Sequence, residues 1–312
     1  MLAKKLMILA ILSMTISPNL KAAGTQNVIY GIDDRREINQ IPQKWIKKQA
    51  NSVAMMVLNN RLKSIDDNYF TYRAVNLGQA LNLCQDTPFI AQPALGNCSG
   101  FLAAPNKIVT AGHCVTNQSD CDNYSWVFNF NSENNGKIKK SQVFKCKSII
   151  QNISEKTSNH IKDYAIIELD GEVTNARPLE FRKKGKVLST TKLYVLGHPD
   201  GIPMKYSDDA KVLSFIKFNF SVGPDFGLEK TELFNFRKDV FLTNLDTFSG
   251  NSGSPVFNKK TGIVEGILIE GENDYEFDMN QGCNNPYQTV QKPFHEGEVV
   301  QRIRAIPKEL LK

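Results

Sequence analysis

The stretch Asp246-Thr-Phe-Ser-Gly-Asn-Ser-Gly-Ser-Pro-Val256 decides how this chain is interpreted. Its second serine, Ser252, lies between Gly250-Asn251 and Gly253, and apolar residues typical of a strand follow. Glycines let the backbone turn tightly, so that neighbouring N–H groups can converge on one point. A serine hydroxyl is a useful nucleophile only when a base takes its proton and donors await the oxyanion. Such a turn alone is more often only a turn, so the interpretation depends on partners elsewhere.

Two upstream segments supply the partners that a nucleophilic serine needs. His113 follows the β-branched run that starts at residue 108, and small neighbours leave room for its ring. Asp163 opens the alternating apolar run of residues 163–169. A histidine can accept the serine proton, and an acid can hold that histidine in the required tautomer. The alternative for His113 is a structural histidine that takes no part in chemistry.

The order of these groups separates two architectures. An α/β-hydrolase would carry Gly-x-Ser-x-Gly and run Ser, Asp, His, whereas this chain runs His113, Asp163, Ser252 and carries Gly-Asn-Ser-Gly. On these residues the chain resembles the chymotrypsin-like (trypsin-like) serine proteases, and most of all their bacterial glutamyl-endopeptidase-like branch. The resemblance spans roughly residues 28–294. It implies an all-β fold of two six-stranded antiparallel β-barrels of the chymotrypsin type with a short C-terminal helix, and it implies no cofactor and no metal.

The same resemblance assigns roles to the motif residues. His113, Asp163 and Ser252 would be the catalytic triad, and the N–H groups of Gly250 and Ser252 would form the oxyanion hole. Asn251 stands where many animal-type relatives have an Asp that pairs with a freed N-terminal ammonium. Because a neutral amide cannot form that ion pair, activation by a freed N-terminus is doubtful in this chain.

The pattern along the chain also indicates an all-β sandwich or barrel, since short apolar runs alternate with turn formers. Residues 170–186 look like a connector between two lobes. We expect the protease domain at 51–312, with a first barrel at about 51–178, a second at about 187–290 and the helix at about 299–311. The expected strands are 52–58, 99–103, 107–111, 126–130, 142–146, 148–150, 163–169, 193–196, 212–216, 240–243, 254–257 and 263–269.

The first residues predict export. Lys4 and Lys5 precede an apolar run, residues 6–16, that is shorter than the roughly 20 residues of a membrane span. Small residues follow, so residues 1–23 read as a secretory signal peptide. Residues 24–50 would be an N-terminal arm or short propeptide, with a short helix at 41–49 and a conceivable second cut before Val28. We expect a secreted or periplasmic protein with no membrane attachment after signal removal.

Six cysteines in an exported chain predict three disulfides. A zinc site is disfavoured because no Cys-x-x-Cys spacing occurs. The family resemblance implies the pair Cys98–Cys114, whose two cysteines flank the hairpin that carries His113. Cys121–Cys146 is a plausible local bridge, and Cys84–Cys283 then follows by elimination.

The charge of the chain argues against one class of partner. The net charge is +6, and removing Lys4, Lys5 and Lys21 of the expected signal leaves 6 − 3 = +3. No basic stripe with interleaved aromatic residues is present, so nucleic-acid binding has little support. We expect protein or peptide substrates, no nucleic acid and a monomer.

The resemblance also points to residues that would bind the substrate side chain just before the cleaved peptide bond. Asp246, six positions before the serine, matches an acid that trypsin-like enzymes use for Arg or Lys; the alternative is a structural, hydrogen-bonded acid. Thr247 matches a Thr of the glutamyl-specific branch, but Leu268 stands where that branch has a His. Ile269 and Gly271 complete the expected set. A basic or an acidic preference therefore stays open.

Three functions are compatible with these motifs. The first is a secreted serine endopeptidase that works through an acyl-enzyme. The second is a catalytically silent binding protein on the same fold, which normally would lack a triad member. The third is an esterase that uses the same triad.

Overall fold

The computed structural model describes residues 29–157, 160–213, 221–222, 228–229, 238–271, 273–289 and 297–311. The expected signal peptide, the possible cut before Val28 and residues 214–216 of one expected strand lie outside these residues. No helix in the described part of the chain has the length and apolar character needed to span a membrane.

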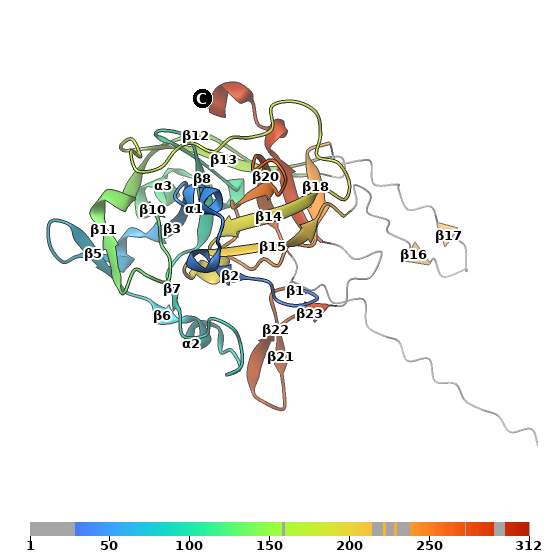
Figure 1. Ribbon diagram of the computed structural model, residues 1–312, viewed down its shortest axis with the longest axis horizontal. Coiled ribbons are helices and arrows are strands. Elements are labelled where there is room, and N and C mark those ends of the chain that lie inside the picture. The colour runs from blue at the N-terminus through green and yellow to red at the C-terminus, as the bar shows by residue number, and fades with distance from the viewer. Residues whose placement is uncertain are drawn as a thin grey trace, which may run out of the picture.

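Six antiparallel strands close the first barrel, in the order β10-β12-β13-β9-β8-β3 (Figure 1). Their inward side chains are large and fully buried, with Trp126 and Phe128 among them, and this buried apolar surface is the main force that holds the barrel together. The strands are β3 (Val53–Leu58), β8 (Cys98–Ala104), β9 (Lys107–Thr110), β10 (Tyr124–Phe128), β12 (Val143–Lys156) and β13 (Ile161–Leu169).

The second lobe is a sheet in the order β18-β24-β20-β19-β14-β15, with the short strand β2 added to β15. Beyond β15 the chain meets β18 again, where Val212 bridges Thr243 and the Leu213 N–H donates to the Leu242 carbonyl at 2.9 Å. The six strands therefore close into a second antiparallel barrel. They are β14 (Lys192–Gly197), β15 (Lys205–Lys211), β18 (Val240–Thr243), β19 (Pro255–Asn258), β20 (Val264–Glu270) and β24 (Glu298–Arg302), and β2 is Arg36–Glu37.

Smaller elements decorate the two barrels. The helices are α1 (Lys44–Ala50), α2 (Leu77–Leu81) and α3 (Gln118–Asn123). The short strands are β1 (Ile29–Tyr30), β4 (Leu62–Ser64), β5 (Tyr69–Tyr72), β6 (Val75–Asn76), β7 (Pro93–Ala94), β11 (Lys137–Lys139), β16 (Ser221–Val222), β17 (Leu228–Glu229), β21 (Tyr275–Asp278), β22 (Cys283–Pro286) and β23 (Gln288–Thr289). The 3-10 turns are Ile38–Gln40, Asn59–Arg61, Gly112–Cys114, Lys140–Gln142, Pro199–Gly201, Ile303–Ala305 and Lys308–Leu311.

The expectation of two six-stranded antiparallel barrels is confirmed, but the C-terminal boundary needs correction. Residues 299–302 belong to β24, so the second barrel extends past residue 290 and the short helix is reduced to two 3-10 turns. The β-branched pair Val299-Val300 favours a strand, and Pro307 prevents a continuous helix from 299 to 311.

One buried apolar cluster joins the two lobes. It contains Val53 and Phe101 from the first barrel and Tyr194 and Phe257 from the second. The loops that leave the barrels beside this cluster are therefore held at fixed distances, and these loops carry the motif residues.

Candidate active site

His113 lies in a 3-10 turn that directly follows β9. Gly112 has no space for a side chain, because a Cβ there would be 2.7 Å from Asp163 Oδ1. The amide of Asn152, on β12, donates to the carbonyls of Gly112 and Val115 at 2.6 and 2.8 Å. The turn that presents the histidine is therefore tied to the barrel wall on both sides of the ring.

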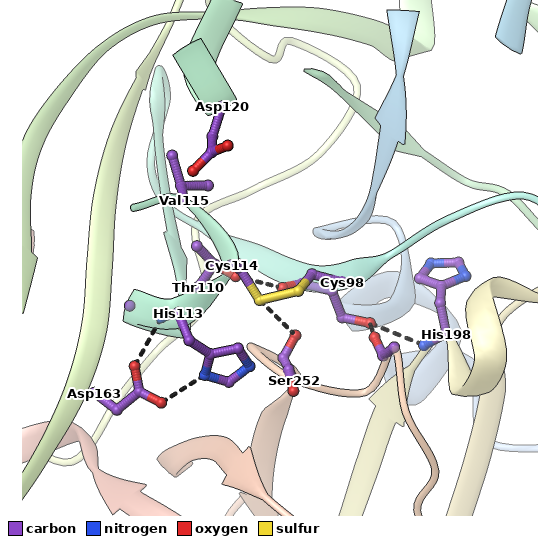
Figure 2. The surroundings of a disulfide bond; sticks show 12 residues. Cys98, Thr110, His113, Cys114, Val115, Asp120, Asp163, His198 and Ser252 are labelled. Atoms are coloured by element: carbon purple, nitrogen blue, oxygen red, sulfur yellow. Dashed lines mark hydrogen bonds and ion pairs between the residues drawn. A yellow bond between two sulfur atoms is a disulfide. The ribbon is translucent and has the colours of Figure 1, made fainter. Parts of the chain in front are cut away.

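Asp163 holds His113 through two contacts (Figure 2). Its Oδ2 lies 2.6 Å from Nδ1 of the ring, and its Oδ1 accepts the backbone N–H of His113 at 2.9 Å. The carboxylate is 13% exposed and the imidazole 41%, so the acid sits behind a ring whose outer edge reaches solvent. Gln301, buried in β24 of the other barrel, accepts the N–H of Asp163 at 3.0 Å. The acid therefore fixes the orientation of the ring through Nδ1, and in the described residues Nε2 has no hydrogen-bond partner.

All six cysteines form disulfides, in the pairs Cys98–Cys114, Cys121–Cys146 and Cys84–Cys283. These are the pairs expected from the sequence. The first joins β8 to the histidine turn and lies between that turn and Ser252, as Figure 2 shows. The two sulfurs lie within 4.8 Å of a nitrogen of His113, but they are bonded to each other and therefore are not metal ligands.

Ser252 sits in a turn whose flanking glycines, Gly250 and Gly253, have φ of +84° and +89°. The first barrel holds this turn through Ser99. The Ser99 N–H donates to the Ser252 carbonyl and its hydroxyl to the Gly250 carbonyl, both at 2.8 Å. The Gly253 N–H donates to the Leu268 carbonyl at 2.7 Å. No local motif revealed Ser99, although it is the neighbour of the disulfide cysteine Cys98.

The expected oxyanion donors are available in this arrangement. In the described residues, the N–H groups of Gly250 and Ser252 donate to no protein acceptor. A Cβ at position 250 would lie 2.6 Å from the His198 carbonyl, so only glycine fits there. Two free N–H groups of neighbouring residues can bind one developing negative charge.

His198 packs behind this turn and has a structural role. Burial lowers the pKa of His198 to about 4, so the ring stays neutral at ordinary pH. Its Nδ1 lies 3.0 Å from the Ile202 carbonyl, and its backbone N–H donates to Ser99 Oγ at 3.0 Å. This ring therefore supports the serine turn and does not compete with His113 as a base.

Asp246 does not have the environment that the sequence suggested for a substrate-binding acid. It is buried, and its two oxygens accept the N–H groups of Tyr30 and Asp34 at 2.8 and 3.0 Å. Burial is the main reason that the pKa of Asp246 is raised to about 7, although these two donors pull the pKa down. These contacts favour the structural, hydrogen-bonded alternative, with the acid bound to the N-terminal arm.

The other expected pocket residues divide into two groups. Leu268 and Ile269 are buried in the apolar clusters of the barrels, so their side chains are packing residues. Thr247 donates its hydroxyl to Glu298 Oε2, and a Cβ on Gly271 would lie 2.6 Å from that same oxygen. The carboxylate beside Thr247 and Gly271 is thus Glu298, a fully buried residue that the motifs did not single out.

The chain is similar to a known protein family and to several solved structures. The model of the trypsin-like peptidase domain matches residues 98–267. Similar solved structures include a Glu endopeptidase in complex with MPD, at 17% identity and a TM-score of 0.46, covering 84% of this chain and 94% of that chain. Another is the active form of the Rv3671c protease from M. tuberculosis, at 14% identity and a TM-score of 0.46, covering 95% of this chain and 90% of that one. No curated protein matches the sequence.

Proposed function

The chain belongs to the trypsin-like peptidase domain family, and from this premise we propose that it is a serine endopeptidase with the triad His113, Asp163 and Ser252. The observation that carries the proposal is the contact of 2.6 Å between Asp163 Oδ2 and His113 Nδ1, on a ring that lies beside the Ser252 turn (Figure 2). A silent binding protein would have no need of an acid that fixes the histidine tautomer.

The reaction would proceed in two halves. Ser252 Oγ attacks the peptide carbonyl carbon while His113 Nε2 takes the hydroxyl proton, and Asp163 stabilises the imidazolium that forms. The carbonyl oxygen becomes an oxyanion, which the N–H groups of Gly250 and Ser252 bind. His113 then gives its proton to the leaving amine, the C–N bond breaks and an acyl-enzyme remains. Water, deprotonated by His113, attacks the ester, and the serine regains its proton as the acid product leaves.

Hydrolysis of casein and of small esters, each compared with the Ser252→Ala variant, tests this proposal. A serine endopeptidase cleaves casein, and the variant loses that activity. Cleavage of esters without casein would favour the esterase alternative. No hydrolysis of either substrate would favour the binding protein.

We further propose that the enzyme prefers a basic residue before the cut. The supporting observation is the Glu298 carboxylate, which contacts Thr247 and faces Gly271, two residues of the expected pocket. Leu268 offers no imidazole that could neutralise a substrate carboxylate, and an acid placed near Glu298 would be repelled. Profiling with a peptide library should show cleavage after Arg or Lys, whereas cleavage after Glu would contradict this preference.

The expected location is extracytoplasmic, secreted or periplasmic, after removal of residues 1–23. Three disulfides support it, because disulfides persist in oxidising compartments. Mass spectrometry of the exported protein should find a chain that begins after residue 23.

A further inference from the structure

The oxyanion loop, Phe248–Asn251, is held by the carboxylate of Asp274 and by the backbone N–H of Asp200, which come from other parts of the chain. The Ser249 N–H donates to Asp274 Oδ2 at 2.9 Å, and the Ser249 carbonyl accepts the N–H of Asp200. The Ser249 carbonyl and the Gly250 N–H belong to one planar peptide and point in opposite directions. Fixing the Ser249 oxygen therefore fixes the direction of the Gly250 N–H, which is one of the two proposed oxyanion donors.

These two acids are partly buried and close enough to affect each other. Burial, followed by the charge of Asp274, raises the pKa of Asp200 to about 7, and burial also raises the pKa of Asp274. The Tyr275 hydroxyl donates to Asp200 Oδ2 at 2.7 Å. Buried carboxylates are costly unless a cation or several donors compensate them, so this pair needs a positive charge nearby.

Arg35 supplies that charge. Its side chain is only 2% exposed, and it binds Asp33 through Nε and Nη2 at 2.8 and 2.7 Å. Its guanidinium carbon lies 3.9 Å from the ring centroid of Phe248, the first residue of the oxyanion loop. The same cation lowers the pKa of both Asp200 and Asp274. Arg35 thus stacks directly on the oxyanion loop and lies near the charges of Asp274, whose carboxylate binds the Ser249 N–H, and of Asp200, whose backbone N–H binds the Ser249 carbonyl.

The N-terminal arm, residues 29–37, sets the position of Arg35. Ile29 is buried against Phe248, and β1 pairs with β23 beside the β21–β22 hairpin that follows Asp274 (Figure 1). The N–H groups of Tyr30 and Asp34 bind Asp246, and β2 adds to the edge of β15. The arm is therefore fixed at several points around the guanidinium.

We propose that Arg35 is a positioning residue, which from the docked arm holds the oxyanion loop so that the Gly250 N–H faces the developing oxyanion. The inference rests on the proposed serine peptidase function. Because Asn251 is neutral, it cannot pair with a freed N-terminal ammonium to hold the loop. In this proposal Arg35, a cation within the arm, holds the loop instead. Arg35 touches no substrate and acts only through Phe248, Asp200 and Asp274.

Kinetics of Arg35→Met, Arg35→Lys and the control Arg36→Met test this inference in the full mature chain. Arg36 is the neighbouring arginine of the same arm, but its side chain is exposed and binds Asp208. Each variant is measured with a peptide substrate, and with two inhibitors of one peptide sequence. A peptidyl boronic acid forms a tetrahedral adduct with the serine and uses the oxyanion hole, whereas the corresponding peptide carboxamide binds without reacting.

We expect Arg35→Met to lower kcat about 10- to 100-fold with KM within about threefold, a loss smaller than or equal to that of one oxyanion donor. The affinity for the boronic acid should fall in proportion to kcat, whereas the affinity for the carboxamide should not change. Arg35→Lys keeps the charge but loses the planar fork, so it should recover part of kcat. Arg36→Met should stay within about twofold of the wild type, since its exposed ion pair contributes little.

The inference would be overturned if Arg35→Met kept the wild-type kcat and the wild-type affinity for the boronic acid. An equal loss of affinity for the boronic acid and the carboxamide would also overturn it, because that result indicates a general structural loss. If Arg35→Met does not fold, Arg35→Lys carries the test, and wild-type kcat in that variant overturns the inference. Wild-type protein that hydrolyses peptides no faster than Ser252→Ala would instead refute the proposed function.

Discussion

The two halves of the proposed active site are held in different ways. The histidine turn, Gly112–Cys114, is fixed within its own barrel by Asp163, by Asn152 and by the disulfide to Cys98. The oxyanion loop depends on Ser99 of the other barrel, on two acids from separate loops and on the N-terminal arm. The difference teaches that the proposed base is positioned by its own barrel, whereas the proposed oxyanion donors are positioned by parts of the chain that meet only in the folded protein.

The largest fall in kcat should come from a change at the histidine turn, the half that is held within its own barrel. Asp163→Asn removes the charge that stabilises the imidazolium and allows the wrong tautomer, so kcat should fall about ten-thousand-fold. The exposed Asp170, at the end of the same strand, provides a matched Asp→Asn control that should leave kcat unchanged. A loss below about tenfold in Asp163→Asn, measured by initial rates on a peptide substrate, would show that the histidine does not need this acid.

Ser99→Ala breaks the contact between the barrels at the oxyanion loop. The change leaves the buried Gly250 carbonyl and His198 N–H without their partner, at about 1–3 kcal/mol for each group. We expect about a tenfold fall in kcat together with reduced stability, from initial rates and denaturant unfolding. Ser125→Ala, which removes a buried hydroxyl far from the site, should reduce stability but not kcat. Equal kcat values in Ser99→Ala and Ser125→Ala would contradict the claim that the oxyanion loop depends on Ser99 of the other barrel.

Asp200 makes the stability of the oxyanion side dependent on pH. Its pKa is raised from 3.8 to about 7 in the folded protein, so between these values the folded chain binds a proton that the unfolded chain has lost. The free energy of unfolding should therefore decrease as pH rises through this range, by up to about 1.4 kcal/mol per pH unit. Asp200→Asn should reduce this slope and increase stability at pH 8. Denaturant unfolding at several pH values measures both the slope and the stability, and an unchanged slope in Asp200→Asn would contradict the raised pKa of this acid.

The smallest effect should follow from extending the N-terminus. Asn251 is buried and its side chain accepts the Ser254 hydroxyl at 3.3 Å, so it offers no charge to an inserted ammonium. A mature chain with extra residues before Val28 should keep most of its turnover number. Complete loss of activity on adding them would show that a freed terminus is required.

The sequence predicts the local half of the site much better than the distant half. His113, Asp163 and Ser252 lie in short motifs, and the order of these motifs distinguishes the fold from an α/β-hydrolase. Ser99, Asp274 and Arg35 lie far from the serine in sequence and carry no motif, so only the folded chain shows that they meet. Asp246 shows the same limit, because the sequence left both a substrate-binding and a structural role open. Its spacing from Ser252 suggested a substrate site, but spacing cannot reveal that backbone N–H groups of the arm bind its carboxylate.

Labelling with a fluorophosphonate tests most directly the claim that Ser252 is an activated nucleophile. The intact protein should gain one adduct, and the peptide that contains Ser252 should carry it after digestion. Ser252→Ala should gain none, and Asp163→Asn should react far more slowly although its serine is present. Equal labelling of Ser252→Ala and wild type, or an adduct on another residue, would contradict the account.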